Sequence, residues 1–500
     1  MKVLFIHPNE YLSIGIPTGI AQLSAVLKNA GHSVDIFDFT FVKTEDDAEY
    51  LQKNANQGVY LPTEYTLEDL VAKDPVISLE KAFSEKIAEF EPELIAVSVM
   101  TGLFDKVINL LNKIPPACKV VFGGVHPTIC PEHTLSYDIV DYICVGEGEE
   151  FLIELCDCLE SGKDISKVKN LGYKKDQIIH INESRAFIDM DDLPVPDWSL
   201  FDQRHLFRPF LGHVYKGSFF VMSRGCPCRC TYCVNASLRN KLKECGRYFR
   251  CQSPKTTIKH IAHLKEHYGA TWFKFADDSI TFFTDEQLEE LATGLQPLNI
   301  QFGCSIRPET TTAKKVNQLK TMGCVAATVG IESGSEMLRK NVLNRKMTNG
   351  QIENAIELLR NAGIRVSTFN MLGIPTETRE DIFKTIALNK KCGIDAVNVY
   401  IVYPYPGTEL SNKYQVSCLE DDGTVISVSK AAQFAMSAMV PAEVEGLLKT
   451  FELYTLLPEE LWPLIKVAES DTHASRIILC VLKDNAIKIS KLRSIDHFCE

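Results

Sequence analysis

Apolar residues in the first third of the chain form short continuous runs that alternate with segments of helical spacing. Val3–Ile6 and Leu94–Val99 are two of the runs, and Ile20–Asn29 and Phe104–Lys113 are two of the helical segments. Buried strands that alternate with helices are typical of a parallel sheet covered by helices on both faces. Such sheets bind ligands beyond the carboxyl ends of their strands. We therefore predict a doubly wound, Rossmann-like α/β domain over residues 1–160.

The alternation resumes near residue 216 in a more regular form. Residues 161–215 carry no long periodic pattern and include the acidic, proline-broken stretch Asp191–Trp198, so we interpret them as a connector. Residues 216–415 contain about six apolar runs with helical segments between them, fewer than the eight units of a closed barrel. We predict a partial (β/α)6 barrel here, followed by a small, mostly helical C-terminal region over residues 416–500.

Composition and charge narrow the class of protein. Apolar residues make up 45% and charged residues 24% of the 500 residues, a balance typical of globular proteins. No apolar run approaches the ~20 residues of a membrane-spanning helix. The N-terminal run ends at His7-Pro8, too early for a signal peptide. Because the net charge of −12 disfavours a nucleic-acid binder, we expect a cytoplasmic protein with no integral membrane segment and no nucleic-acid partner.

Four of the 17 cysteines crowd into one short loop. An odd number of cysteines without an export signal favours reduced thiols, a few of which are metal ligands. Cys226, Cys230 and Cys233 are separated by three and then two residues, directly after the first predicted barrel strand. Barrel strands present catalytic groups at that end, and soft thiolates suit iron–sulfur centres. We predict that these three thiolates hold a cubane cluster with one iron left open, and that Cys228 is a spectator.

Two other interpretations of these residues are weaker. A zinc site would need a second ligand pair, and Cys245 and Cys251 lie outside the usual spacing. Buried structural thiols do not usually crowd on a loop marked by glycine and proline. His260, His263 and His267 share one face of a predicted helix. They lack an acidic or cysteine partner at ligand spacing, so we interpret them as an ordinary helix face.

The cysteine spacing, placed after the first strand of a partial barrel, resembles that of the radical S-adenosylmethionine (SAM) superfamily. Other segments resemble the branch of that superfamily with an N-terminal cobalamin-binding domain, and the resemblance runs from residue 1 to about residue 415. The matching segments of the barrel are Phe275–Ser279, Gly330–Ser335, Gly373–Thr378 and Tyr403–Thr408, and those of the first domain are Gly123–Thr128 and Val145–Glu149.

The resemblance implies cofactors and contacts in the barrel. A [4Fe-4S] cluster on Cys226, Cys230 and Cys233 would bind SAM at its open iron. Some of the implied contacts also have ordinary structural explanations, since Glu332 could cap the next helix and the two aspartates could be turn residues. Where Thr376 stands, the family often has a small residue. The residues that would contact SAM are Tyr232, Asp277, Asp278, Arg307 and Glu332.

The resemblance also implies how the first domain would hold cobalamin. The chain lacks the Asp-x-His-x-x-Gly sequence that places a histidine on cobalt, which implies a lower cobalamin face without a histidine. Glycines at strand ends allow close approach of a ligand, although they are equally common as plain turn residues. The implied contacts are Gly123, Gly124, His126, Thr128, Gly146, Glu147 and Gly148.

Taken together, the resemblance predicts a cobalamin-dependent radical SAM enzyme. A class B methyltransferase, which methylates an unactivated carbon through a 5′-deoxyadenosyl radical and methylcobalamin, is the leading hypothesis. Its partners would be a small-molecule or peptide substrate and a low-potential electron donor such as flavodoxin or ferredoxin. A cyclase or rearrangement enzyme with the same cofactors is the alternative, and a non-enzymatic cobalamin sensor is a weaker one. A tRNA methylthiotransferase is disfavoured because the first cysteine is Cys118 and the chain is acidic.

Overall fold

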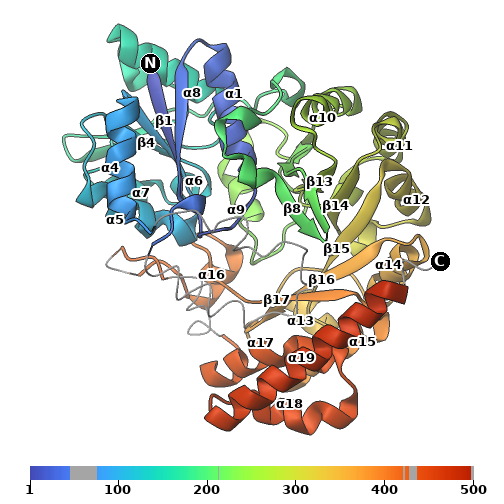
Figure 1. Cartoon of the computed structure of the whole chain (residues 1–500). Helices are drawn as coiled ribbons and strands as arrows, with labels where there is room; N and C mark the ends of the chain where they lie inside the picture. Colours follow the sequence, from blue (N-terminus) through green and yellow to red (C-terminus); the bar gives the residue numbers. More distant parts are fainter. Residues whose placement is uncertain (45–75, 212, 421–422, 427–435, 497–500) are drawn as a thin grey trace.

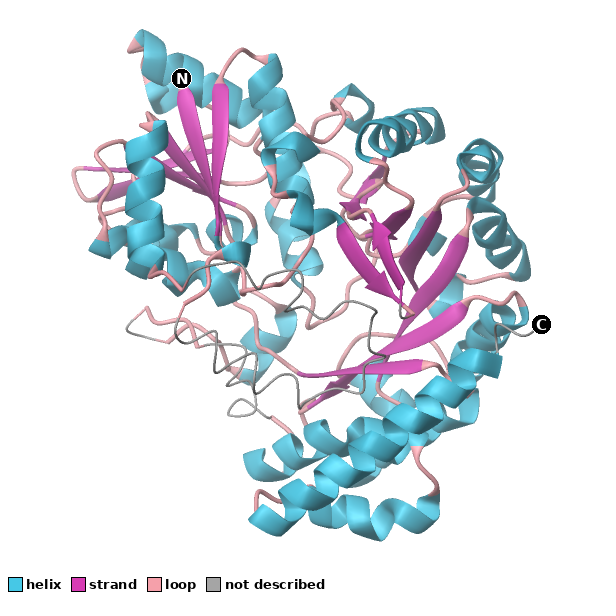
Figure 2. Ribbon diagram, in the orientation of Figure 1, coloured by secondary structure: helices cyan, strands magenta, loops and turns pink. Residues whose placement is uncertain are grey.

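The computed structural model describes residues 1–44, 76–211, 213–420, 423–426 and 436–496 (Figure 1). Two sheets organise these residues, each flanked by helices, and a group of helices near the C-terminus packs beside the second sheet (Figure 2). The predicted fold class, a Rossmann-like domain followed by a partial βα barrel, is confirmed.

The first sheet begins with five parallel strands in the order β2-β1-β3-β4-β5. The order reverses between β1 and β3, and ligands of open parallel sheets bind at such a switch point. Helices α1 and α8 cover one face and helices α4 and α5 cover the other. The strands are β1 (Lys2–His7), β2 (Ser33–Asp38), β3 (Leu94–Ser98), β4 (Lys119–Gly123) and β5 (Tyr142–Cys144), and the helices are α1 (Thr18–Asn29), α4 (Leu79–Phe90), α5 (Phe104–Lys113) and α8 (Glu149–Ser161).

A hairpin from the expected connector completes this sheet. Strand β6 (Leu171–Lys175) pairs antiparallel with β5, and β7 (Ile178–Ile181) pairs antiparallel with β6. The first domain therefore extends past the predicted boundary at residue 160. The hairpin escapes the sequence pattern because β7 lies at a sheet edge with mostly exposed side chains, so it lacks the apolar run of a buried strand.

The second sheet is a six-stranded half barrel whose strands pair in parallel and in sequence order. Helices cover its outer face (Figure 2). The strands are β10 (Phe219–Phe220), β13 (Trp272–Phe275), β14 (Gln301–Ile306), β15 (Cys324–Glu332), β16 (Arg365–Leu372) and β17 (Ala396–Ile401), and the helices are α10 (Pro254–Tyr268), α11 (Asp285–Leu295), α12 (Ala313–Met322), α14 (Asn349–Asn361) and α15 (Arg379–Cys392).

The C-terminal helices complete the outer layer of the half barrel. Helix α17 (Pro441–Leu456) packs on α15 and on β17, where a sixth barrel helix would lie. Helices α18 (Trp462–Ala468) and α19 (His473–Asp496) pack against α17. The shared core of these elements places Phe451 next to residues such as Ile382 and Ile386 of α15. The C-terminal region is thus an integral part of the barrel wall.

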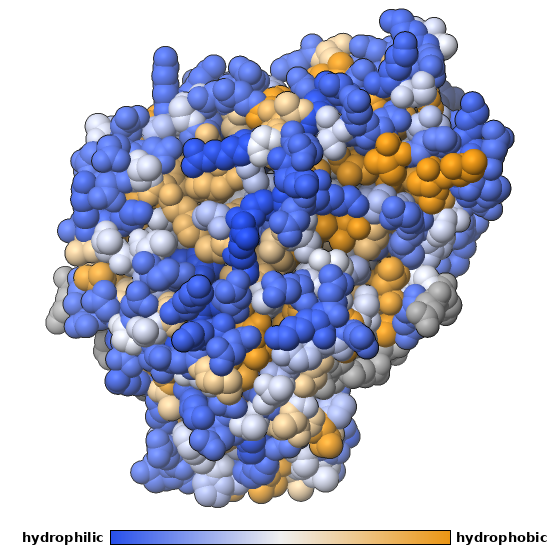
Figure 3. Space-filling model, turned by 180° about the vertical axis from the view of Figure 1, so that it is seen from behind, coloured by the Kyte–Doolittle hydropathy of each residue, from blue (hydrophilic) through white to orange (hydrophobic). Residues whose placement is uncertain are grey.

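One apolar core runs through both domains. It joins residues of α1 and α8 to those of the barrel strands, with the fully buried Trp198 of the connector among them. Polar contacts reinforce the junction, since His205 bonds to Asp38 at 2.7 Å and Ser218 accepts the backbone N–H of Ile16 at 2.8 Å. Among the described residues, no helix is both long and apolar enough to cross a membrane. Polar residues dominate the face shown in Figure 3, and they border its apolar patches.

Candidate functional site

The cysteine loop lies between the two domains. Strand β11 (Ser223–Arg224) pairs antiparallel with β12 (Arg250–Cys251) and leads into the loop 225–233, which ends at α9 (Val234–Lys241). Gly225 has a φ of 78°, and a Cβ there would lie 2.5 Å from the backbone oxygen of Tyr248. A residue with a side chain would strain this turn, so glycine is required to start the loop.

Three thiols of this loop fit an iron–sulfur cluster better than a single metal ion. Cys226 and Cys230 are buried, and Cys233 is half-buried at the N-cap of α9. In the part of the chain that the structure describes, no three His, Cys, Asp or Glu side chains converge on one metal position. A [4Fe-4S] cluster needs no such convergence because it is held at separate irons by thiolates. The donor set, three soft sulfurs on one loop, therefore suits that cluster.

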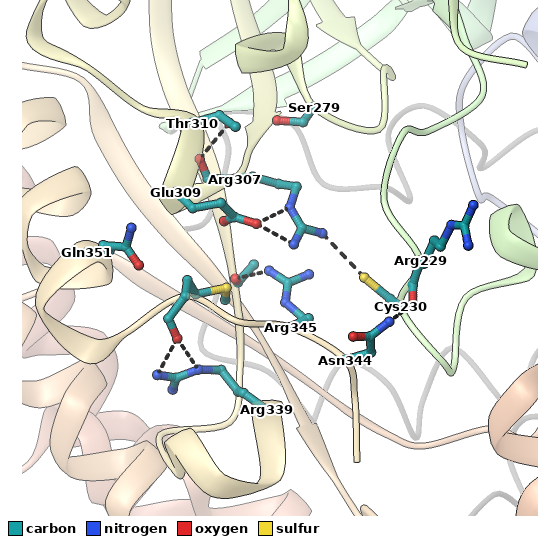
Figure 4. Close-up of polar contacts among 12 residues, drawn as sticks. Arg229, Cys230, Ser279, Arg307, Glu309, Thr310, Arg339, Asn344, Arg345 and Gln351 are labelled. Atoms are coloured by element: carbon teal, nitrogen blue, oxygen red, sulfur yellow. Dashed lines mark hydrogen bonds and ion pairs between the residues drawn. The ribbon is translucent and has the colours of Figure 1, made fainter. Parts of the chain in front are cut away.

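Arg307 directly follows β14 and lies next to the cysteine loop. Its Nη1 donates to the Sγ of Cys230 at 3.4 Å, and its Nε donates to Oε1 of Glu309 at 2.8 Å. Figure 4 shows the Arg307 side chain between Glu309 and Cys230. A buried guanidinium beside a thiolate stabilises the charged sulfur, and it offers a charged donor for a carboxylate ligand. The structure thus brings the predicted Arg307 to the cysteines.

Tyr232 and Glu332 meet through an arginine that sequence analysis missed. Nη1 of Arg345 donates to the Tyr232 hydroxyl at 3.2 Å and lies 3.3 Å from Oε1 of Glu332. Its Nη2 donates to the backbone oxygen of Gly330 at 2.6 Å, and its buried Nε has no hydrogen-bond partner among the residues that the structure describes. Arg345 lies on a loop after a short helix with no periodic pattern around it, so only the fold reveals its role.

Glu332 does not cap the next helix, as one structural alternative supposed. That helix, α13 (Glu336–Asn341), has Ser335 as its N-cap. Glu332 adopts a φ of 66°, a left-handed conformation that is rare for residues other than glycine. Such strain is concentrated at functional sites. The strained backbone turns a mostly buried carboxylate toward Arg345 at the carboxyl end of β15.

The two predicted aspartates occupy different positions. Asp277 is buried, and its Oδ1 accepts bonds from the backbone N–H of Met222 at 3.0 Å and from the Ser223 hydroxyl at 2.5 Å. It therefore holds the strand that enters the cysteine loop. Burial raises its pKa to about 6. Asp278 is exposed and accepts from Asn235 of α9 at 3.0 Å, at the rim of the loop.

A cavity of about 370 Å³ lies at the carboxyl end of the first sheet, against the barrel. Backbone and apolar atoms form much of its wall, and Gly124 shows why glycine is needed. Its φ is 99°, and a Cβ there would lie 2.8 Å from the backbone oxygen of Val99. The predicted residues that line the cavity are Gly123, Gly124, Gly146, Glu147 and Gly148.

His126 and Thr128 stand behind the cavity wall. The buried His126 contacts Thr101 through Nδ1 at 3.2 Å and His133 through Nε2 at 3.0 Å. Burial lowers its pKa to about 3, so the ring is neutral. Thr128 donates to the backbone oxygen of Gly124 at 2.8 Å and accepts from the backbone N–H of Gly146 at 3.2 Å. Both side chains thus shape the glycine loops from the protein side.

The cavity suits the nucleotide tail of a cobalamin. Its wall includes apolar side chains of β1, β3 and α8 together with glycine backbone, and the aromatic base of that tail needs such an apolar surface. Both ring nitrogens of His126 are already bonded within the protein.

The turn at Thr376 and Glu377 and the histidines of α10 have structural explanations. Thr376, where the family often has a small residue, has a φ of 66°, which accounts for that preference. The neighbouring Glu377 is fully buried, and its carboxylate accepts from the backbone N–H groups of Gly373 and Ile374 at 2.8 and 3.3 Å. His263 and His267 stack on each other at 3.8 Å and belong to no metal-binding group within the described ranges.

Comparisons with known proteins agree with these features. The Radical SAM superfamily matches residues 220–388, and the B12 binding domain matches residues 9–156. The chain is 29% identical over 426 residues to an uncharacterized methyltransferase, PH0819, of Pyrococcus horikoshii, covering 82% of each chain. It is 26% identical over 452 residues to the anaerobic magnesium-protoporphyrin IX monomethyl ester cyclase of Cereibacter sphaeroides, covering 86% of this chain and 65% of that protein.

Two solved structures share the fold. The radical SAM methyltransferase TsrM from Kitasatospora setae, solved with cobalamin and a [4Fe-4S] cluster, aligns with a TM-score of 0.62 at 16% identity, over 96% of this chain and 88% of that one. The cobalamin-dependent SAM radical enzyme OxsB aligns with a TM-score of 0.64 at 14% identity, over 98% of this chain and 72% of that one. At these identities, the likeness concerns the fold alone.

Proposed function

We propose that this chain, which belongs to the radical SAM enzymes that carry a B12 binding domain, is a methyltransferase that acts on an unactivated carbon of a small molecule. The observation that carries the proposal is the position of the cysteine loop, between the carboxyl ends of the barrel strands and the cavity of the first domain. This position would allow the protein to combine radical formation on the barrel side of the loop with methyl transfer from cobalamin on the other side.

When bound, the cluster with SAM supplies a 5′-deoxyadenosyl radical, and cobalamin supplies a transferable methyl group. In this proposal, Cys226, Cys230 and Cys233 hold the cluster. Arg307 binds the SAM carboxylate, and Tyr232 and Glu332, oriented by Arg345, contact its adenosine. The mostly buried Arg307, Glu332 and Arg345 keep water away from this part of the site.

The glycines of the cavity are proposed to contact cobalamin through their backbone. Gly123 is the last residue of β4 and Gly124 follows it, while Gly146 and Gly148 precede α8. His126 and Thr128 act indirectly by fixing these loops. Asp277 and Asp278 fix the cysteine loop at its two ends, since their bonds reach Ser223 on one side and Asn235 on the other.

Substrate is proposed to lie over the carboxyl ends of the barrel strands. The inward face of the half barrel carries small hydroxyl side chains, and those of Thr328 and Ser367 are 2.9 Å apart. Phe369 lies two residues beyond Ser367 on β16, and its ring centroid is 6.1 Å from that of Tyr400. A low-potential electron carrier such as flavodoxin or ferredoxin is the proposed reductant, and the cytoplasm the proposed location.

A cyclase with the same cofactors is the second candidate, because the relative from Cereibacter sphaeroides is named as one. The test is an anaerobic incubation of the reconstituted protein with SAM, a reductant and cobalamin, followed by mass spectrometry. Methyl transfer predicts both 5′-deoxyadenosine and S-adenosylhomocysteine, the latter only with cobalamin. Formation of 5′-deoxyadenosine alone would favour the cyclase.

Two cysteine variants give this test its internal control. Cys226→Ala removes a cluster ligand, so we expect loss of both products and of cluster iron. Cys228→Ala removes the neighbouring thiol that we interpret as a spectator, so we expect cluster iron and both products to remain. Normal SAM cleavage by Cys226→Ala would contradict the assignment.

A further inference from the structure

An ion network joins the two domains next to the cysteine loop. Glu147 lies on the loop before α8 in the first domain, and Arg224 is the last residue before Gly225 in the second. Oε1 of Glu147 accepts from Nη1 of Arg224 at 2.9 Å and from Nη2 of Arg250 at 2.5 Å. Arg224 also pairs with Glu149. The four side chains are between 7% and 24% exposed, so the network is largely shielded from solvent.

Glu147 allows Arg224 and Arg250 to lie next to each other. Arg224 and Arg250 are directly paired in the β11–β12 ladder, and like charges in that relation are destabilising. A carboxylate shared between the two guanidinium groups removes the repulsion. The backbone oxygen of Ile188 fixes Arg250 from the side at 2.9 Å. The short ladder that opens the cysteine loop therefore depends on a residue of the other domain.

The same network faces the cavity of the first domain. Glu147, Glu149 and Arg224 are all among the residues that line it. A ligand that fills the cavity thus contacts the side chains that hold the start of the cysteine loop. The network offers a physical connection between the cavity and the cluster, and it uses charged contacts that tolerate little displacement.

We propose that Glu147, Arg224 and Arg250 are positioning residues that couple occupancy of the cavity to the order of the cysteine loop. The inference rests on the proposed function, in which the cavity takes cobalamin and the loop takes the cluster. Coupling of binding free energies is reciprocal, so cobalamin that orders the loop is itself bound more tightly by an ordered loop. Through the network, order in the cysteine loop and cobalamin binding would then favour each other.

The test is hydrogen–deuterium exchange of loop 225–233 in the reconstituted full chain, with and without hydroxocobalamin. In the unsubstituted protein we expect saturating hydroxocobalamin to slow exchange about tenfold, within the usual range of coupling between sites. In Glu147→Gln we expect hydroxocobalamin still to bind, but with the slowing largely lost. The electron paramagnetic resonance spectrum of the reduced cluster should respond to added cobalamin, which the same reductant converts to cob(II)alamin, in the unsubstituted protein and not in the variant.

Further variants separate coupling from general damage. Arg379→Gln breaks an ion pair with Glu469 at 2.6 Å, far from the cysteine loop, so it should retain the full response. Arg224→Gln and the double variant Glu147→Gln/Arg224→Gln complete the comparison. The loss of response in the double variant should be smaller than the sum of the two single losses, because both single substitutions break the Glu147–Arg224 contact.

Three results would overturn the inference. An undiminished response in Glu147→Gln would do so, and so would a double variant whose loss equals the sum of the two single losses. Hydroxocobalamin that binds the unsubstituted protein without slowing loop exchange would also do so, with the proposed function left standing. If the unsubstituted protein assembles no cluster or binds no hydroxocobalamin, the proposed function fails together with the inference.

Discussion

Ionisable side chains that are nearly or fully buried lie next to the site, and their surroundings decide their protonation state. Glu377 is fully buried, and two backbone N–H groups bond to one of its oxygens, while the other oxygen has no hydrogen-bond partner within the described part of the chain. Burial raises its pKa to about 8. Arg345 is also buried, but a carboxylate and a tyrosine hydroxyl face it. The same physical cost of burial thus leaves one group neutral and the other charged.

Glu377 should make stability depend on pH. The folded protein holds this proton up to about pH 8, whereas the unfolded chain releases it near 4.5, so stability falls as the pH rises between these values. Glu377→Gln imitates the protonated form, and we expect it to remove this contribution. Thermal unfolding at pH 5.5 and pH 8.5 should then show a smaller loss of Tm for the variant than for the unsubstituted protein. An equal loss in both proteins would exclude this role.

Arg345 should be as important for SAM binding as the residues that the motifs indicate. Arg345→Met removes the group that orients Tyr232 and leaves Glu332 buried without a partner, a costly arrangement. We expect SAM affinity to fall at least about tenfold, which corresponds to ~1.4 kcal/mol. Equilibrium dialysis of SAM against the reconstituted variant measures this affinity. Arg360→Met, on the outer helix α14, is the matched control and should bind SAM normally.

Helix and strand boundaries follow the apolar pattern where the elements are buried on a regular face. The strands β1 and β3 and the helix α5 all lie within a residue of their expected limits. The pattern was less informative at the edges of the two sheets. Strand β7 has exposed side chains, and α17 completes the barrel from beyond the last expected barrel residue at 415.

Helix α17 should contribute strongly to stability because it is a wall of the barrel. Phe451 is fully buried between this helix and α15, so Phe451→Ala removes a large apolar group from a packed core. We expect a destabilisation of about 3–5 kcal/mol, measured by chemical denaturation. Glu445→Ala, an exposed position on the same helix, should change stability by less than about 0.5 kcal/mol. Equal effects of the two substitutions would mean that α17 does not pack as the structure shows.

At the scale of the whole molecule, the domains behave as one body. Their common core includes residues of both sheets, and the His205–Asp38 and Glu147–Arg224 pairs cross the junction. Interfaces of this apolar kind restrict relative domain motion. The proposed chemistry needs that restriction, because the cysteine loop belongs to the barrel while the cavity belongs mainly to the first domain.

Unfolding of the unsubstituted protein should therefore be cooperative across both domains. Separating them would expose the buried core around Trp198, which is too large an apolar surface for either domain to leave in water. We expect a single transition in scanning calorimetry. Two well-separated transitions, with the first assigned to residues 1–183 by limited proteolysis, would contradict this continuous core.

The sequence by itself determined the order of the elements and the chemistry of the cluster. Alternating apolar runs reflect burial of whole strands, a local property that periodicity reports. The three cysteines proposed as ligands could be recognised because they lie within one short loop. Tyr232, Arg307 and Glu332 were predicted from the family resemblance, and the structure brings all three to the cysteine side of the barrel.

Only the tertiary structure decided which side chains meet across the chain. Arg345 reaches Glu332 and Tyr232 because separate strand ends converge at one edge of the barrel. Glu147 was expected to contact cobalamin, yet its carboxylate is bound to two arginines of the other domain, while His126 is bonded to Thr101 and His133 and is not among the residues that line the cavity. The Glu147–Arg224, Glu147–Arg250 and Arg345–Tyr232 contacts join residues 77, 103 and 113 positions apart. They leave no local pattern, because a buried charge is stabilised by a partner that need not be near it in sequence.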